Sequence, residues 1–169
     1  MGSRFISNFV YILDKENNPH FVQRYYGANL GDSYRSDIYL NTKSYCVLDL
    51  YMTDEVEVEG EFLPHVKEKE WRSFFTEGPS PNIATILAEA GLADISISKL
   101  VFLYMESSSH MILEFDGFVS SAEGLQPFDE DFLNQALAAT SAGTNSIAQQ
   151  ETLIAQWIIE QVRKGNTSG

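Results

Sequence analysis

The chain has little cysteine, few basic residues and no long apolar run. Cys46 is the single cysteine among 169 residues, so no disulfide can form within the chain. Lys and Arg number 11 against 24 Asp and Glu, which gives a net charge of −13. Because nucleic acids and anionic membranes bind clustered Lys and Arg, this balance argues against both as direct ligands. No apolar run approaches the roughly 20 residues that a transmembrane helix needs.

The short motifs of several enzyme classes are also missing. There is no glycine-rich phosphate loop and no Gly-x-Ser-x-Gly nucleophile turn. His20, His65 and His110 lie far apart in the sequence, and none has the spacing of a local metal site. We therefore predict a protein that is not an enzyme, with no catalytic residues, no cofactor and no metal.

The composition predicts a globular chain. Hydrophobic residues make up 44% of it and aromatic residues 12%, enough for one core-forming domain over residues 1–169 with a flexible tail at 165–169. The residues before Phe9 are too few and too polar for a signal peptide. With a single cysteine, this favours a cytoplasmic protein.

The first strong pattern is a β-hairpin. An apolar run at Phe9–Leu13 predicts one strand, and His20–Tyr26 predicts its partner. Asp14–Pro19 is polar and contains the residue types of a turn. The glycines and polar residues of Gly27–Ser36 predict a loop.

A second hairpin is expected further along the chain. Lys99–Glu106 and His110–Val119 predict two strands joined by a turn at Ser107–Ser109. Their dense apolar content is typical of strands that are buried on both faces in the middle of a sheet.

The segment between the hairpins is ambiguous. Helical spacing of apolar residues favours a helix over Asn41–Thr53, although its aromatic and β-branched content is typical of strands. Asp54–Glu59 alternates acidic residues with valine, which predicts an exposed edge strand protected by its charges. A metal site there is less favoured, because these carboxylates would project along one strand face instead of converging.

Residues 61–91 predict an insertion or long loop that carries short helices. Glu68–Phe75 would be one helix, anchored by its aromatic residues. Asn82–Ala90 predicts a second helix, with Gly91 as its C-cap.

The carboxy-terminal third predicts two helices. Asp129 or Asp131 would cap the first, which runs to about Thr140. The second would start at Asn145 or Ser146, with Gln149 placed for a capping box, and would end at Gly165. Together these elements predict an α+β fold in which an antiparallel sheet of about five strands is packed by helices.

Two short patches resemble a known family. The turn sequence Lys15-Glu16-Asn17-Asn18-Pro19 between two apolar strands resembles the start of sedlin-like subunits of the TRAPP vesicle-tethering complex. Leu48-Asp49-Leu50, followed by Asp54-Glu55, resembles the first helix of those subunits. The resemblance implies a longin-like fold.

The same resemblance implies a function through protein contacts. Such subunits have no catalytic site and work within an assembly that acts on Rab-type GTPases. It implies other protein subunits as partners, a small GTPase as an indirect one, and no nucleic acid or inserted membrane. The partner-binding residues would be Leu48, Asp49 and Tyr51. The location would be cytoplasmic, peripheral to Golgi or endosomal membranes.

Two other classes of function stay open. The acidic charge is also typical of an immunity-type inhibitor that neutralises a basic protein, since complementary charge speeds association. A small ligand-binding or enzymatic domain without a recognisable motif is the remaining alternative.

Overall fold

The computed structural model describes residues 4–29, 34–40, 45–49, 55–58, 61–64, 66–108, 111–141 and 147–166. These residues form strands and short or medium helices of an α+β chain. The strands are β1 (Arg4–Asp14), β2 (Pro19–Asn29), β3 (Tyr34–Leu40), β4 (Tyr45–Asp49), β5 (Glu55–Val58), β6 (Glu61–Pro64), β7 (Ile97–Ser107), β8 (Ile112–Ser121) and β9 (Gly124–Pro127). The helices are α1 (Glu68–Arg72), α2 (Phe74–Glu77), α3 (Pro81–Glu89), α4 (Glu130–Thr140) and α5 (Ile147–Lys164).

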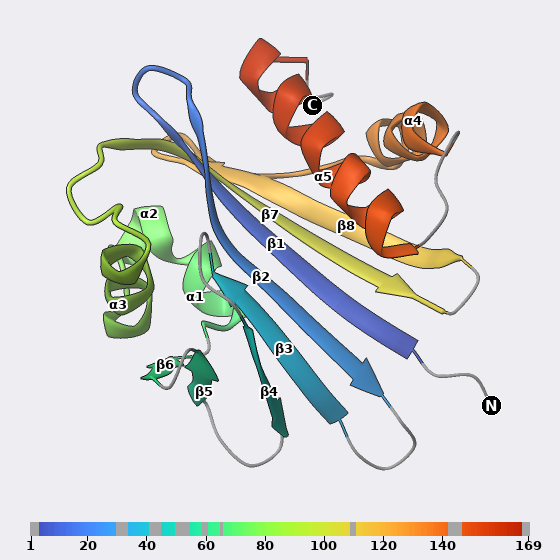
Figure 1. The fold of residues 1–169 in the computed structure, drawn as a ribbon. Helices are drawn as coiled ribbons and strands as arrows, with labels where there is room; N and C mark the ends of the chain where they lie inside the picture. Colours follow the sequence, from blue (N-terminus) through green and yellow to red (C-terminus); the bar gives the residue numbers. More distant parts are fainter. Residues whose placement is uncertain are drawn as a thin grey trace.

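One antiparallel sheet dominates the molecule (Figure 1). Within the described residues its strand order is β4-β3-β2-β1-β7-β8-β9, while β5 and β6 pair separately. The first strand therefore lies in the middle, between β2 and β7. β3, β2, β1, β7 and β8 have seven or more residues each, and the shorter β4 and β9 flank them. This confirms the predicted α+β architecture of an antiparallel sheet packed by helices.

Helices cover both faces of the sheet, because apolar side chains of its central strands point to both faces. Val10 and Ile12 of β1 face the layer of α1, α2 and α3, where Trp71 is also buried. Phe9 and Leu13 face the opposite layer, which is formed by α4 and α5. β7 is buried in the same two-sided way, as its dense apolar sequence predicts.

The β1–β2 turn is closed by one carboxylate and held by the last helix. The Asp14 side chain accepts hydrogen bonds from the backbone N–H groups of Glu16 and Asn18, at 2.9 and 2.8 Å. Asn17 has a left-handed backbone, with φ of 68°. Its side-chain amide donates to the Arg163 carbonyl at 2.9 Å, and Arg163 Nε donates to the Asn17 carbonyl at 3.1 Å. The turn therefore serves to dock the hairpin on α5.

Both predicted strand pairs are confirmed, although β7 includes Ser107 of the predicted second turn and β8 begins only at Ile112. The segment that follows the first hairpin differs from prediction. The predicted loop Gly27–Ser36 is wrong at both ends, since β2 continues to Asn29 and β3 begins at Tyr34. The predicted helix over Asn41–Thr53 is wrong across Tyr45–Asp49, which forms β4; the rest of that range lies outside the described residues. Pairing with β3 stabilises Tyr45–Asp49 as a strand, although the spacing of its apolar residues also fits a helix.

The region from 61 to 91 is structured. It contains β6, α1, α2 and α3 in place of a long loop, and its status as an insertion stays a prediction. The predicted single helix Glu68–Phe75 is wrong, because α1 ends at Arg72 and α2 begins at Phe74. Trp71 and Phe74 are buried and anchor these short helices, as expected. Glu55–Val58 is a strand, which confirms the predicted element, although its side chains lie outside the described part of the molecule.

The predicted caps of the helices are largely confirmed. Asp129 caps α4 by accepting from the Phe132 N–H at 2.8 Å. Gly91 and Gly165 follow α3 and α5 with φ of 76° and 75°, so each helix ends on a left-handed residue. The proposed start of α5 at 145 or 146 lies outside the described residues. Among the helices that the structure describes, none combines the length and apolar character needed to cross a membrane.

Candidate functional site

An acidic patch occupies one end of the sheet, on the face that also packs against α1, α2 and α3. The patch consists of Glu106 on β7 and of Glu114 and Asp116 on β8. Glu106 lies directly opposite Glu114 in the strand register, and Asp116 lies opposite Tyr104. Glu114 and Asp116 are exposed, while Glu106 and Tyr104 are half-buried.

The patch begins where the apolar cover of this face ends. Phe102 and Phe118 form a stacked pair across β7 and β8, with ring centroids 5.2 Å apart. The Arg72 guanidinium from α1 lies 4.7 Å from the centroid of the Phe118 ring. One step further along each strand, the same face carries Tyr104 and Asp116 instead. The hydrophobic layer therefore gives way to an acidic surface within two residues of β7 and β8.

The largest effect on the pKa values of Asp116 and Tyr104 is their partial removal from water. Partial removal from water raises the pKa of Asp116, the charge of Glu68 raises this pKa further, and Arg72 lowers it. Desolvation also raises the pKa of the Tyr104 hydroxyl, and the three carboxylates of the patch add to that effect. The carboxylates thus form a local negative field, and a positive charge placed beside them would be stabilised.

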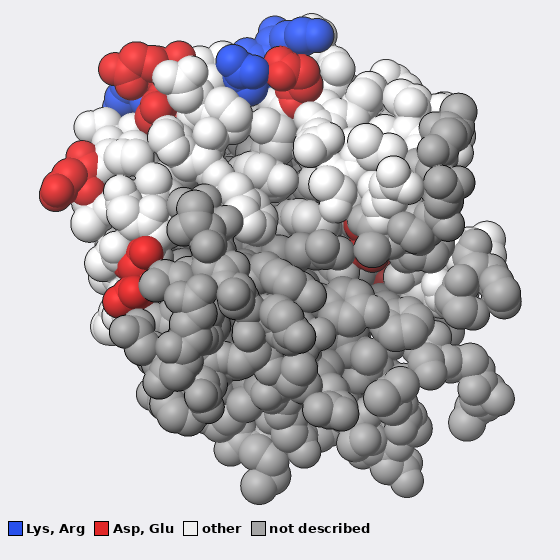
Figure 2. Space-filling model, viewed as in Figure 1, with Lys and Arg blue, Asp and Glu red and all other residues white. Residues whose placement is uncertain are grey.

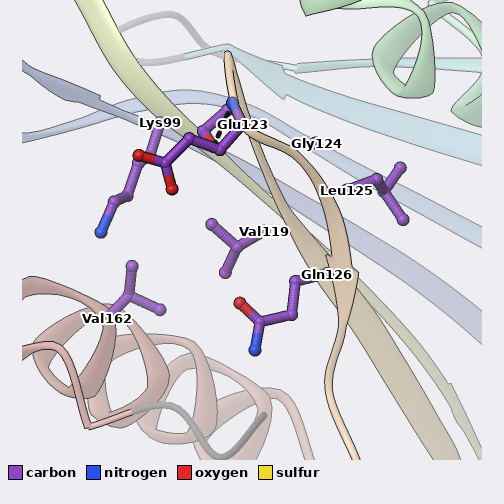
Figure 3. Close-up of a pocket in the computed structure, with 8 residues that line it drawn as sticks. Lys99, Val119, Glu123, Gly124, Leu125, Gln126 and Val162 are labelled. Atoms are coloured by element: carbon purple, nitrogen blue, oxygen red, sulfur yellow. Dashed lines mark hydrogen bonds between the residues drawn. The ribbon is translucent and has the colours of Figure 1, made fainter.

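A shallow groove lies at the opposite end of β8, between the β8–β9 hairpin and α5. Its volume is about 250 Å³. Figure 3 shows Val119 and Val162 pointing toward each other across it, with Lys99, Glu123 and Gln126 at its rim. Leu125 points away from the hollow and packs in the core on the other face of the sheet. Because Val119 and Val162 line its two sides, this groove resembles a gap in the packing between α5 and the sheet.

The surface on the α4 and α5 side carries charges of both signs at one end. Figure 2 shows acidic and basic side chains side by side at the top, where the β1–β2 turn and the end of α5 lie in Figure 1. Glu160 and Arg163 form one such ion pair, at 3.0 Å. Neighbouring opposite charges cancel at a distance, so this end offers no field of one sign.

The residues predicted to bind a partner are not brought to this patch by the structure. Leu48 and Asp49 belong to β4, at the other edge of the sheet, and their side chains lie outside the described part. Tyr51 is not among the described residues. His20 bonds to Asp14 at 2.9 Å within the first hairpin, and His65 and His110 also lie outside the described residues.

No cluster of three or more His, Cys, Asp or Glu side chains in the described ranges is arranged to hold a metal ion. The acidic patch therefore does not have metal-site geometry. Sequence reasoning had predicted the β7–β8 hairpin but not this patch. Its signal was present in the sequence: Glu106, Glu114 and Asp116 interrupt two otherwise apolar strands.

Comparisons of the chain with protein-family models, with curated proteins and with solved structures found no match.

Proposed function

We propose that this chain is a non-enzymatic protein-binding module whose partner presents a basic surface to the acidic patch. The observation that carries the proposal is that Glu114 and Asp116 are both exposed on the same face of β8, with Glu106 of β7 opposite Glu114 in the register. Like charges directly opposite each other on neighbouring strands destabilise a sheet. A basic partner would offset the repulsion between these carboxylates by placing positive charge beside them.

The overall charge supports the same proposal. A net charge of −13 attracts a basic protein over distances longer than direct contacts and raises its association rate. Binding of this kind weakens as salt screens the charges.

Two biological settings fit such a module. In the first, the partner is another subunit of a vesicle-tethering or GTPase-regulating assembly in the cytoplasm, and the support is the hairpin sequence Lys15–Pro19. The sequence segment Leu48–Leu50 gives this setting less support, because the family has a helix there and this chain has β4 across Tyr45–Asp49. In the second, the partner is a basic protein that the chain inhibits, and the acidic patch supports that setting directly.

The proposal is tested by capturing proteins from extracts of the source cell on the immobilised chain, at low and at high ionic strength. We expect a small set of basic proteins that is released by salt. Trafficking subunits in that set would favour the first setting, and a basic toxin or nuclease the second. A bound set that is not basic, or that resists salt, would contradict the proposal.

A further inference from the structure

The first half of β8 forms an edge of the sheet. β9 pairs only with Phe118–Ser121 of β8. The Phe128 N–H continues that contact by donating to the Gly117 carbonyl at 3.0 Å. Before that point, Ile112–Asp116 has β7 on one side and no neighbouring strand on the other within the described part of the chain.

The backbone direction along this edge follows from the Gly117 contact. In an antiparallel strand, alternate residues point both their N–H and C=O groups to the same side. Because the Gly117 carbonyl points outward to Phe128, the N–H and C=O of Phe115 point outward as well. Phe115 therefore presents a backbone donor and acceptor toward the open side of the sheet.

The register with β7 shifts between Glu114 and Ile112, so the side chains of this edge alternate regularly only over Glu114–Asp116. Phe115 is buried against the α4 and α5 layer, while Glu114 and Asp116 point to the opposite face and are exposed. Met111, just before the strand, is 55% exposed. A strand added here would need an apolar residue opposite Phe115 and basic residues opposite Glu114 and Asp116.

We infer that the edge Ile112–Asp116 accepts an additional antiparallel strand from the basic partner, with alternating basic and apolar residues. This inference rests on the proposed function and specifies its docking mode. A second copy of the chain is disfavoured as the occupant, because antiparallel pairing centred on Phe115 would place Glu114 of each copy opposite Asp116 of the other.

Edge charges have a simpler use, which the test must separate from docking. Charged side chains on an edge strand prevent unwanted pairing with other chains. If that were their only role here, an added strand of complementary charge would have no specific binding position at this edge. Two versions of one synthetic peptide, which differ only in which backbone N–H group is blocked, distinguish the two roles.

The probe is the peptide Lys-Val-Lys-Val-Thr, whose first three residues would lie opposite Asp116, Phe115 and Glu114 and stop short of the Gly117–Phe128 contact. It is titrated into the isotopically labelled full chain and followed by amide NMR at low salt. We expect shifts of the Phe115 and Gly117 amides and slower hydrogen exchange at Phe115. Methylating the backbone nitrogen of the first valine, which would face β8 at Phe115, should weaken binding by about tenfold, the effect of one lost hydrogen bond. Methylating the backbone nitrogen of the second lysine, which would face away, is the matched control and should change binding less than about twofold.

The outcomes separate this inference from the proposed function. Equal weakening by the two methylated peptides, or no shift of any β8 amide, overturns strand addition but leaves the proposal of a basic partner standing. The double variant Glu114→Lys/Asp116→Lys should abolish the peptide shifts, whereas Glu89→Lys, on an exposed position of α3, should not. Peptide binding unchanged by the double variant would overturn the inference and would also count against the acidic patch as the binding surface.

Discussion

Asn17 shows how one residue can join two distant segments. It holds the left-handed position of the β1–β2 turn and exchanges hydrogen bonds with Arg163 at the end of α5. The turn itself could be predicted from Asp14–Pro19, because its residue types act locally. Its contact with α5 could not, since nothing local indicates a partner so far along the chain.

Replacing Asn17 tests that contact. We expect Asn17→Ala to lower the free energy of unfolding by about 1–3 kcal/mol, because alanine is strained at positive φ and lacks the side-chain donor. Asn17→Gly should cost less, since glycine relieves the strain. Chemical denaturation measures both. Equal stability of Asn17→Ala and the wild type would show that the turn does not depend on this residue.

Asp14 gives the hairpin a dependence on pH. The hydrogen bond from His20 and those from the backbone of Asn18 and Glu16 hold the pKa of Asp14 below its usual value of 3.8. A depressed carboxyl pKa stabilises the fold above the unfolded pKa, and this contribution is lost as pH falls through the folded pKa. The window therefore lies below 3.8. Acid unfolding of Asp14→Asn should be less steep there, and an unchanged acid limb would contradict the assignment.

β7 and β8 are the elements most readily predicted from the sequence. Their dense apolar content indicated strands with two buried faces, and the structure confirms this. Tyr45–Asp49 was predicted wrongly because its apolar spacing fits a helix as well as a strand. The choice depends on pairing with β3, of which only Tyr34–Ser36 lies in the segment predicted as a loop, and the rest of β3 was not predicted as a strand.

Gly117 permits the close pairing of β7 and β8. A Cβ atom at this position would lie 2.2 Å from the Phe102 carbonyl oxygen and 3.2 Å from Leu103 Cα, and both of these atoms belong to the backbone. We expect Gly117→Ala to destabilise the fold by about 3 kcal/mol, as overpacking in a core does. Thermal unfolding measures the loss. Gly78→Ala is the comparison, since no atom lies within 4 Å of its Cβ position and its cost comes only from positive φ.

At the scale of the whole molecule, a strongly acidic chain carries an acidic patch at one end of its sheet. Charge and fold class could be predicted from composition and hydrophobic pattern. The patch could not, because Glu106 and Glu114 are brought together only by the register of two strands.

The patch also implies that a substitution which removes its negative charge raises the stability of the fold and weakens binding of a basic partner. Glu114→Lys replaces a repulsive cross-strand pair with an attractive one, so it should raise the free energy of unfolding by about 0.2–1 kcal/mol. The gain should shrink as salt is added. A stability decrease in this variant, measured by denaturation at low salt, would show that Glu106 and Glu114 do not repel each other in the folded chain.

Partner capture by the double variant Glu114→Lys/Asp116→Lys tests the central claim most directly. We predict that this variant folds with at least wild-type stability and loses the basic proteins that the wild type captures at low salt, while Glu89→Lys retains them. Retention of the same proteins by the double variant would contradict the account.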